Sequence, residues 1–280
     1  MRAVRRPQGA GRQALVTGLN GTLAPVLAAA ARAAGHAVLG WDRQRVPPED
    51  GSAGHAWLQA ERPDAIAHLA TGDAAWAALL AGWAAARGLP FVLTSTAMVF
   101  HHEPDGPHGL HDTRTAQDDY GRSKVRNEDA VLGAHPGACV ARIGWQIDPS
   151  RPGNNMLMQL DDWQRREGCV AASRAWRPAC SFMADTARAL LALLEDPLPG
   201  PVHLDSNADE GHAFDHVVAA LKQAFGREAW QLRVHEDYRH DQRLAGGAVR
   251  LPPLSARLPL LRSGQGARHP RRHALRISRT

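Results

Sequence analysis

The sequence has few cysteines, and they form no recognisable motif. Its 280 residues include three, Cys139, Cys169 and Cys180, with no Cys-x-x-Cys pair among them. An odd number of widely spaced cysteines argues against a disulfide framework and favours a reducing compartment. We therefore expect a cytosolic (cytoplasmic) protein without disulfide bonds.

The chain also lacks a hydrophobic run long enough to cross a bilayer. Its longest apolar stretch, from Ala74 to Ala86, is shorter than the ~20 residues that a membrane-spanning helix needs. The N-terminal segment has no apolar stretch suited to a signal peptide. With 44% hydrophobic residues, the chain can bury a full core as one large domain, or as a domain with a smaller lobe. We expect a globular protein that does not enter a membrane.

Acidic residues are absent from the C-terminal end. Residues 242–280 hold nine arginines and no Asp or Glu, so this segment carries +9, whereas the whole chain carries +5 and the other 241 residues sum to −4. No aromatic residues interleave with these arginines, which favours a solvated tail over a nucleic-acid-binding arm. We expect residues 262–280 to form a disordered basic tail, with no nucleic-acid partner. If the tail did bind nucleic acid, deletion after Leu261 would abolish a salt-sensitive binding.

What the chain does have is an alternation of apolar runs with Ala-rich helical segments. This pattern is typical of the α/β class, and we expect a Rossmann-type doubly wound parallel sheet with a small C-terminal substrate lobe. Strands are predicted at 14–17, 37–41, 65–69, 91–94, 139–143 and 202–204, and helices at 23–34, 74–87, 120–132, 185–194 and 214–225. The expected division is a basic lead-in (1–13), a nucleotide-binding domain (14–145, completed by 185–206) and a lobe with covering helices (146–184 and 207–261).

A glycine-containing turn follows the first predicted strand. Gly18, Gly21 and Ala24 give the pattern Gly-x-x-Gly-x-x-Ala at the start of a predicted helix. Gly18 permits a tight turn, Gly21 lets the backbone approach a pyrophosphate, and Ala24 allows the helix to pack closely on the sheet. The helix N-terminus offers free N–H groups to the phosphates. An ordinary strand-to-helix turn can have the same composition, so the turn alone is weak evidence.

Asp42 strengthens this interpretation because it ends the next predicted strand, 21 residues after Gly21. A carboxylate at that place can accept hydrogen bonds from the adenosine ribose of a dinucleotide. Arg43 and Arg45 follow directly, and either can bind the 2′-phosphate that distinguishes NADP from NAD. The sequence therefore predicts a dinucleotide site and leaves NAD and NADP both open.

The chain has two tyrosines, and one begins the segment Tyr120-Gly121-Arg122-Ser123-Lys124. Residues i and i+4 share one face of a helix, so we expect the lysine cation to lower the pKa of the Tyr120 phenol from about 10. Upstream, the predicted strand 91–94 runs into Ser95 and Thr96. The Thr96 hydroxyl should then lie at the C-terminal end of a strand, where open α/β sheets bind ligands, and can hydrogen-bond a substrate carbonyl.

Together these motifs resemble the extended short-chain dehydrogenase/reductase family, in particular its branch of dTDP-4-dehydrorhamnose reductases and NAD-dependent sugar-nucleotide epimerases. The resemblance covers roughly residues 14–261 and is strongest up to Trp145. It rests on Thr17-Gly18-Leu19-Asn20-Gly21, His68-Leu69-Ala70, Ser95-Thr96 with Val99-Phe100, Tyr120-Gly121-Arg122-Ser123-Lys124, and Ala141-Arg142-Ile143-Gly144-Trp145.

The resemblance implies a triad of Thr96, Tyr120 and Lys124 in an NAD(P)-dependent reductase that acts on a keto group of a nucleotide-activated sugar. The tyrosine would donate a proton to the carbonyl oxygen, the threonine would orient it, and the lysine would also contact the nicotinamide ribose. The implied cofactor-binding residues are Thr17, Gly18, Asn20, Gly21, Thr22, Leu23, Asp42, Arg43, Leu69, Ala70, Tyr120 and Lys124. The implied substrate contacts are Thr96, Asn155, Arg174 and Arg177, with Trp176 in the same pocket.

Two positions depart from the pattern of the family. Ala97 and Met98 stand where the rhamnose-pathway reductases usually have an acidic residue and a tyrosine, and where sugar-nucleotide dehydratases usually have an acid pair. The departure argues against a dehydratase and leaves the substrate open. The alternatives are an NAD(P)-dependent sugar-nucleotide epimerase and a non-catalytic NAD(P)-binding protein, like the regulatory subunits of methionine adenosyltransferase.

Two further clusters have simpler explanations. One is rich in metal-binding residue types, namely His101, His102, His108 and His111 with Glu103, Asp105 and Asp112. Its spacing fits no ligand pattern, and its Pro and Gly residues predict a loop, so we expect no metal site. The other is the pair Trp76 and Trp83, seven residues apart on a predicted helix, which indicates an apolar stripe facing the core or a dimer partner. By resemblance, this helix and the Tyr120 helix can pair in a homodimer.

Overall fold

The computed structural model describes residues 12–263. Its main sheet has six parallel strands in the order β10-β5-β4-β3-β1-β2. These are β1 (Gln13–Thr17), β2 (Ala37–Gly40), β3 (Ala65–His68), β4 (Phe91–Thr96), β5 (Cys139–Ile143) and β10 (Gly200–Leu204). The six predicted strands are confirmed, and β4 is two residues longer because Ser95 and Thr96 pair with Arg142 and Ile143 of β5.

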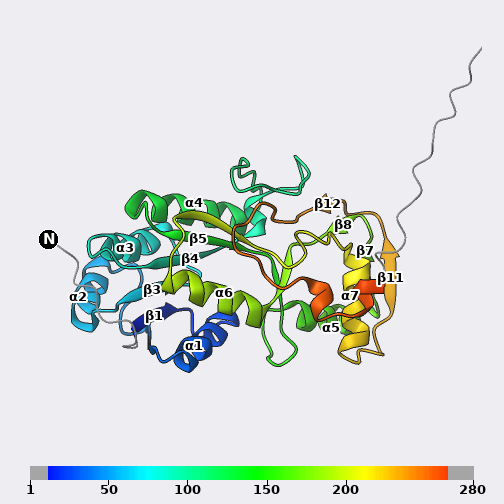
Figure 1. The fold of residues 1–280 in the computed structure, drawn as a ribbon, viewed down its shortest axis with the longest axis horizontal. Coiled ribbons are helices and arrows are strands. Elements are labelled where there is room, and N and C mark those ends of the chain that lie inside the picture. The colour runs from blue at the N-terminus through cyan, green and yellow to red at the C-terminus, as the bar shows by residue number, and fades with distance from the viewer. Residues whose placement is uncertain (1–11, 264–280) are drawn as a thin grey trace, which may run out of the picture.

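Helices cover both faces of this sheet, as predicted (Figure 1). One face carries α1 (Leu23–Ala33) and α6 (Met183–Glu195), which pack against each other; the other carries α3 (Ala74–Ala85) and α4 (Asp119–Ala134). A further helix, α2 (Gly51–Glu61), packs against α3. The chain passes from β1 to β2 on one side and then to β3 on the other side of β1. The strand order therefore reverses between β1 and β3, which is the point where ligands bind in doubly wound sheets.

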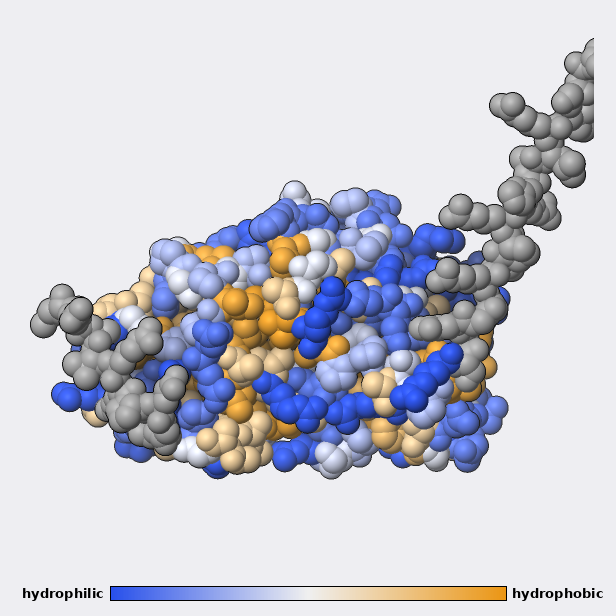
Figure 2. All heavy atoms as spheres, viewed as in Figure 1, coloured by the Kyte–Doolittle hydropathy of each residue, from blue (hydrophilic) through white to orange (hydrophobic). Residues whose placement is uncertain are grey.

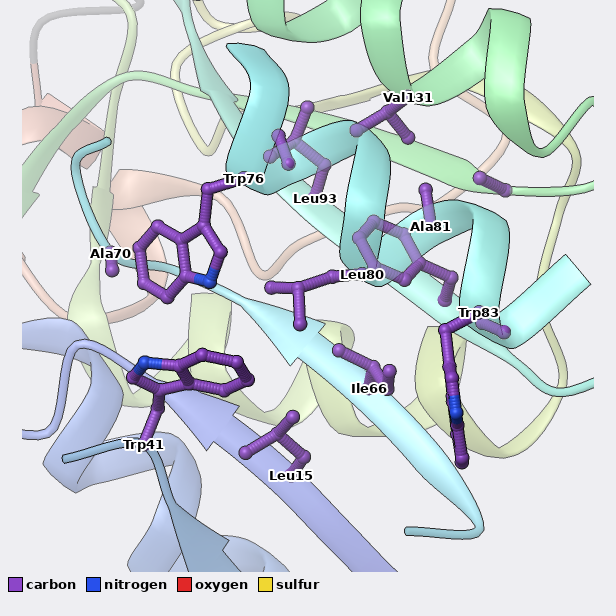
Figure 3. Close-up of a cluster of buried hydrophobic side chains, with 14 of the residues drawn as sticks. Leu15, Trp41, Ile66, Ala70, Trp76, Leu80, Ala81, Trp83, Leu93 and Val131 are labelled. Carbon is purple, nitrogen blue, oxygen red and sulfur yellow. The ribbon is translucent and has the colours of Figure 1, made fainter. Parts of the chain in front are cut away.

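The core between the sheet and α3 is built around tryptophans (Figure 3). Trp76 and Trp83 are 1% and 5% exposed. Trp76 makes edge-to-face contacts with Trp41, at 5.5 Å between ring centroids, and with His68, at 4.6 Å. Such contacts add to the stabilisation from burial alone. The predicted apolar stripe thus faces the core, with α4 packed against the same helix.

The remaining elements surround a second hydrophobic cluster, on the right in Figure 1. They include helices α5 (Met156–Glu167), α7 (Phe214–Ala224) and α8 (Leu260–Ser263) and the 3-10 turn η2 (Leu254–Ala256). The other 3-10 turn, η1 (Ala97–Val99), follows β4 and packs in a smaller cluster with Phe100, Ala179 and Leu244. Three parallel two-strand ladders join β6 (Trp145–Ile147) to β9 (Cys180–Phe182), β7 (Val170–Ser173) to β11 (Leu232–His235), and β8 (Trp176–Arg177) to β12 (His240–Asp241). The division of the chain into two domains at residues 145, 184 and 206 stays a prediction.

The C-terminal prediction needs one correction. Arg262, expected in the tail, lies in α8, and its Nε donates to the Ser255 carbonyl at 2.8 Å. The arginine is held there because it satisfies carbonyl groups of the preceding turn, which a composition-based argument does not detect. Ser263 ends the same helix. Residues 264–280 of the predicted tail and residues 1–11 of the lead-in lie outside the described residues.

The surface and the cysteines agree with the composition. Cys139, Cys169 and Cys180 are all unpaired, which confirms the expectation of no disulfide bond. Among residues 12–263, no helix has the length and apolar character required to span a bilayer. Figure 2 shows a mostly hydrophilic face with hydrophobic residues gathered near its middle.

Candidate active site

A large cleft lies at the C-terminal ends of the main-sheet strands. Its volume is about 1740 Å³, and the turns after β1, β2, β3, β4 and β5 all contribute to its lining. Pockets for one small ligand measure roughly 300–1,000 Å³. The cleft therefore has room for a dinucleotide and a second molecule.

The glycine turn after β1 forms one end of this cleft. Gly18 has φ +82°, and a Cβ on it would come within 3.0 Å of the Ala70 backbone. The Gly21 amide donates to the Gly18 carbonyl at 2.8 Å, which closes the turn. Helix α1 begins directly afterwards, and the side chain of its N-cap residue, Thr22, makes no capping hydrogen bond. The bare backbone and the uncapped N–H groups fit the pyrophosphate of NAD or NADP.

Thr17 is buried behind this turn and does not line the cleft. It is fully buried, and its hydroxyl accepts hydrogen bonds from the amides of Leu69 and Ala70, each at 3.1 Å. It also bonds Nδ1 of His68 at 2.8 Å. Burial lowers the pKa of His68 to about 3, so this ring is neutral at physiological pH. Thr17 thus ties the end of β1 to the end of β3 and holds Ala70 against Gly18.

Asp42 and Arg43 line the cleft beyond the end of β2. Oδ1 of Asp42 accepts from the Gln44 amide at 2.9 Å. Arg43 donates to the Thr71 carbonyl, and its guanidinium carbon lies 4.9 Å from the centre of the Trp76 ring. Both side chains are therefore placed at the end of the cleft that an adenosine ribose would occupy.

Thr96, Tyr120 and Lys124 meet in the same cleft. Thr96 ends β4, its hydroxyl accepts from the Met98 amide at 3.2 Å, and its proximity to Tyr120 acts to lower the pKa of that phenol. Nζ of Lys124 donates to the Thr94 carbonyl at 3.1 Å and lies 5.8 Å from the centre of the Tyr120 ring. The structure thus brings together the three residues that the sequence argument put into one triad.

Helix α4 reaches this position through two local features. Asp118 caps the helix by accepting from the Gly121 amide at 2.8 Å. Gly121 lies so close to η1 that a Cβ on it would collide with the Met98 carbonyl oxygen. A glycine next to Tyr120 therefore lets the first turn of α4 pack directly on the end of β4.

The protonation of this group differs from the prediction. Partial desolvation in the cleft raises the pKa of Tyr120, although nearly half of its side chain is exposed, and the interaction with Thr96 opposes this only in part. Lys124 is itself buried, which lowers its pKa to about 8, and its ammonium group is hydrogen-bonded to a backbone carbonyl. The expectation that Lys124 lowers the pKa of Tyr120 is therefore wrong for this structure, because desolvation, together with the nearby Asp118 carboxylate, raises that pKa.

Three predicted substrate contacts do not line the cleft. Asn155 is buried, and its Oδ1 caps α5 by accepting from the Met158 amide at 3.2 Å. Arg174 is exposed and faces Glu236 at 3.8 Å, and Arg177 is exposed as well. The structure therefore assigns capping and surface positions to these residues.

Sequence reasoning missed most of the residues at the opposite end of the cleft from the glycine turn. This end is lined by Ile143, Gly144, Trp145, Gln146, Trp176, Tyr238 and Gln242. Of these, only Trp176 was expected in the pocket. Tyr238, the second tyrosine of the chain, is 42% exposed. It lies between β11 and β12, where the sequence has no regular hydrophobic pattern that would place it.

The sequence profile of the RmlD substrate binding domain matches residues 72–225, more than half of the chain. The chain belongs to this family. The matched part of this RmlD-family protein contains Thr96, Tyr120 and Lys124, and it ends before Tyr238 and Gln242. The glycine turn lies before the matched part.

Solved structures share the fold of this RmlD-family chain. The NADP complex of dTDP-4-dehydrorhamnose reductase from Bacillus anthracis gives a TM-score of 0.75 at 15% identity, covering 91% of this chain and 99% of that one. The Bordetella bronchiseptica enzyme WbmH in complex with NAD+ gives 0.70 at 19% identity, covering 89% and 96%. UDP-N-acetylglucosamine 4-epimerase from Bacillus cereus gives 0.69 at 15%, covering 85% and 91%. A comparison with curated protein sequences finds no match.

The histidine-rich loop of this RmlD-family chain is packed instead of grouped around a metal position. Within residues 12–263, no three His, Cys, Asp or Glu side chains are arranged to hold a metal ion. Nε2 of His108 lies 3.2 Å from Nε2 of His240, and the His108 ring stacks on Phe100 at 4.5 Å. Burial lowers the pKa of both histidines. The pair therefore joins this loop to β12 as neutral rings.

Lys124 of this RmlD-family chain should titrate near pH 8, being cationic below that pH and neutral above it, because burial disfavours its charged form. The sequence contains two lysines, Lys124 and Lys222, so NMR of protein labelled at lysine resolves the group directly. A Lys222→Arg variant assigns the signals. A midpoint at or above the ordinary value of 10.5 would contradict the burial argument.

Proposed function

We propose that this chain is an NAD(P)-dependent oxidoreductase that reduces a keto group of a nucleotide-activated sugar by hydride transfer. One observation carries the proposal: Thr96, Tyr120 and Lys124 line the same cleft as the glycine turn after β1. This cleft has room for two ligands. It is supported by the solved relatives, which include a reductase with NADP and an enzyme with NAD+. The nucleotide-sugar substrate is taken from the names of two relatives, dTDP-4-dehydrorhamnose reductase and UDP-N-acetylglucosamine 4-epimerase.

The residues proposed to hold the cofactor follow the cleft from the glycine turn to the triad. They are Gly18, Asn20, Gly21, Thr22, Leu23, Asp42, Arg43, Leu69, Ala70, Tyr120 and Lys124, all of which line it. The nicotinamide ring supplies the hydride when the cofactor is bound. Thr17 is proposed as a support of the turn, because its hydroxyl is occupied by the β3 end.

The proton comes from Tyr120 in this proposal. Its raised pKa keeps the phenol protonated at neutral pH, which suits a group that donates a proton to a carbonyl oxygen. Thr96 and Tyr120 line the same cleft, and Thr96 is close enough to influence the pKa of the phenol, so a carbonyl oxygen within reach of both hydroxyls would be oriented by both. Below about pH 8, Lys124 is positively charged, and its Nζ lies 5.8 Å from the centre of the Tyr120 ring, where we propose that it contacts the nicotinamide ribose.

The test of the proposed function is oxidation of NADPH or NADH by the purified full-length chain, with a panel of 4-keto sugar nucleotides. We expect loss of the reduced-cofactor absorbance with at least one ketone and none without substrate. A protein that binds NADPH but oxidises none of it across the panel would contradict the proposal. An epimerase would convert a sugar nucleotide without net cofactor oxidation, so product analysis in the same assay separates the two.

A second candidate, a non-catalytic cofactor-binding protein, is favoured by the residues that follow Thr96. Ala97 and Met98 both line the cleft, and Met98 exposes an apolar side chain there. Neither can exchange a proton with a substrate. This candidate predicts tight cofactor binding with no turnover by the wild-type chain.

Arg43→Ala should weaken the binding of NADP about tenfold and that of NAD much less, because a guanidinium hydrogen bond to a phosphate is of the stronger, charge-assisted kind. Arg43 lines the cleft beside Asp42, whereas Arg45 is exposed and does not line it, which makes Arg45→Ala the matched control. Thermal shift against each cofactor measures the effect, since a ligand of the folded state raises its melting temperature. Equal losses for both cofactors would contradict a role in NADP selection.

A further inference from the structure

An exposed loop crosses from the second hydrophobic cluster to the glycine turn of the cleft. It consists of residues 149–154, all of them exposed, and we call it the strap. The strap joins β6 to α5, and its residues Pro152, Gly153 and Asn154 line the cleft. One wall of the cleft at the glycine turn is therefore supplied from outside the main sheet.

Buried polar side chains hold both ends of the strap. At its start, Oδ1 of Asp148 accepts from the amide and the hydroxyl of Ser150, at 2.8 and 2.7 Å. At its end, Nδ2 of Asn155 donates to the Arg151 carbonyl at 3.0 Å. Asp148 and Asn155 are 8% and 1% exposed. The path of the strap is thus fixed where it leaves the fold and where it returns to it.

The middle of the strap touches the glycine turn at the residue that begins α1. The Thr22 hydroxyl donates to the Asn154 carbonyl at 3.4 Å and does not cap the helix. Gly153 has φ +125°, and a Cβ on it would collide with Cγ2 of Thr22. Only glycine combines this backbone conformation with so close an approach. The strap therefore lies directly against the helix N-terminus, whose free N–H groups suit a phosphate.

The strap also brings a positive charge to this end of the cleft. Among the described residues that line the cleft, the Lys and Arg side chains are Lys124 and Arg43, and both donate to backbone carbonyls. Arg151 is the one charged residue of the strap. Its exposed side chain forms no ion pair with the described residues. Arg151 precedes Gly153 by two residues, which span about 7 Å at most, so its long side chain can reach the glycine turn.

We infer that the strap covers the diphosphate of a bound NAD or NADP, and that Arg151 supplies the cation that faces it. Arginine binds phosphate through charge-assisted, often bidentate hydrogen bonds, which would add to those from the N–H groups of α1. The diphosphate is common to both cofactors, so Arg151 serves both, whereas Arg43 lies at the ribose end. The inference rests on the proposed function in one respect, namely that a dinucleotide binds at the glycine turn.

Arg151→Ala tests the charge, by calorimetry on the full-length chain with NADPH, NADH, ADP-ribose and adenosine as probes. The first three contain the diphosphate and should bind about tenfold more weakly, and adenosine should bind as before. The losses should shrink at high salt, because ionic interactions are screened. Arg165→Ala is the matched control, since this exposed arginine of α5 pairs with Asp162 at 2.6 Å and does not line the cleft. It should change none of the affinities.

A cross-link between the strap and α1 tests the covering. A Cβ on Gly153 would lie 3.7 Å from Cβ of Thr22, within the spacing of about 3.5–4.5 Å that disulfides require. Thr22→Cys and Gly153→Cys are combined with Cys169→Ser, which removes the native cysteine that is not buried. Oxidation with NADPH bound should slow its release about tenfold or more, because a covered ligand leaves only when its cover opens. Reduction should restore the rate, and the reduced form carries the same backbone strain.

The inference is overturned if Arg151→Ala binds ADP-ribose as the wild type does, or if NADPH leaves the oxidised and reduced forms at the same rate. Failure of the two cysteines to cross-link would contradict the contact between the strap and α1, and the inference with it. Failure of the proposed function differs, because these measurements involve no turnover. A chain that shows both effects but oxidises no NADPH would contradict the reductase proposal alone, and a reductase whose Arg151→Ala variant binds normally would contradict the inference alone.

Discussion

Replacing Tyr120 by phenylalanine should slow carbonyl reduction by about 10²–10⁴-fold, the usual contribution of a positioned general acid, and leave the affinity for NADPH unchanged. The substitution removes the hydroxyl that lies near Thr96 and keeps the ring. Tyr120 is 46% exposed, so the change empties no part of the core. The measurement is kcat for reduction together with the cofactor Kd.

Arg122→Ala is the matched control for this variant. Arg122 is on the same turn of α4, is exposed, and pairs with Asp119 at 3.2 Å outside the cleft lining, so its loss should leave kcat within a factor of about two. If Tyr120→Phe abolishes a measured activity without changing cofactor affinity, the non-catalytic candidate fails. An active Tyr120→Phe protein would remove Tyr120 from the chemistry.

Glu128→Ala should destabilise the folded chain by about 3–5 kcal/mol, because it breaks a buried ion pair and leaves the partner charge uncompensated. Glu128 is 1% exposed and accepts from the Ser95 hydroxyl at 2.5 Å, from Arg142 at 3.0 and 2.8 Å, and from Arg114 at 3.2 Å. Arg142 is nearly as buried. Thermal unfolding should show a fall in Tm of roughly 6–20 °C.

Asp129→Ala is the matched control, because it removes an exposed carboxylate that pairs with Arg114, which also pairs with Glu128. Asp129 pairs with Arg114 at 2.8 Å but is exposed, so its removal should change the free energy of unfolding by about 1 kcal/mol or less. Similar losses for both variants would show that burial of the Glu128 pair is not the source of the effect. Glu128 lies one helical turn after Lys124 on α4. Its hydrogen bonds with Ser95 and Arg142 also hold α4 against the ends of β4 and β5, where Thr96 lies.

The main sheet could be predicted because each of its strands is a short apolar run next to a segment with a helical pattern. The α2 helix was not predicted because only two of its residues, Gly54 and Leu58, are buried. Its sequence therefore shows almost no regular spacing of apolar residues. The ladders around the second cluster were missed for another reason. Strands such as β8 (Trp176–Arg177) and β12 (His240–Asp241) span two residues each, which is too short for alternation to show.

The candidate site likewise contains residues that the sequence predicts correctly and residues that it does not. Gly18, Asp42 and Thr96 each follow or end a strand of the sheet, and the carboxyl ends of parallel strands meet at one edge, so the sequence sufficed to bring them together. Asn155 and Arg174 carry suitable polar groups, but helix capping and a surface contact determine where their side chains lie. The pKa of Tyr120 could not be predicted, because it depends on burial, which residue spacing does not reveal.

The position of β10 at the edge of the main sheet affects how the chain folds during synthesis. β10 pairs with β5 in the register Gly200 to Cys139, and the segment between them contains α5, β6, β7, β8 and β9 of the second cluster. The ribosome therefore releases much of that cluster before the sheet can be completed. Until then β5 presents an open edge of unpaired N–H and C=O groups, the kind of edge on which strands of other chains can add. The cluster between the sheet and α3 ends at Val140, so all of its residues are made before those of the second cluster, whereas the sheet itself waits for β10.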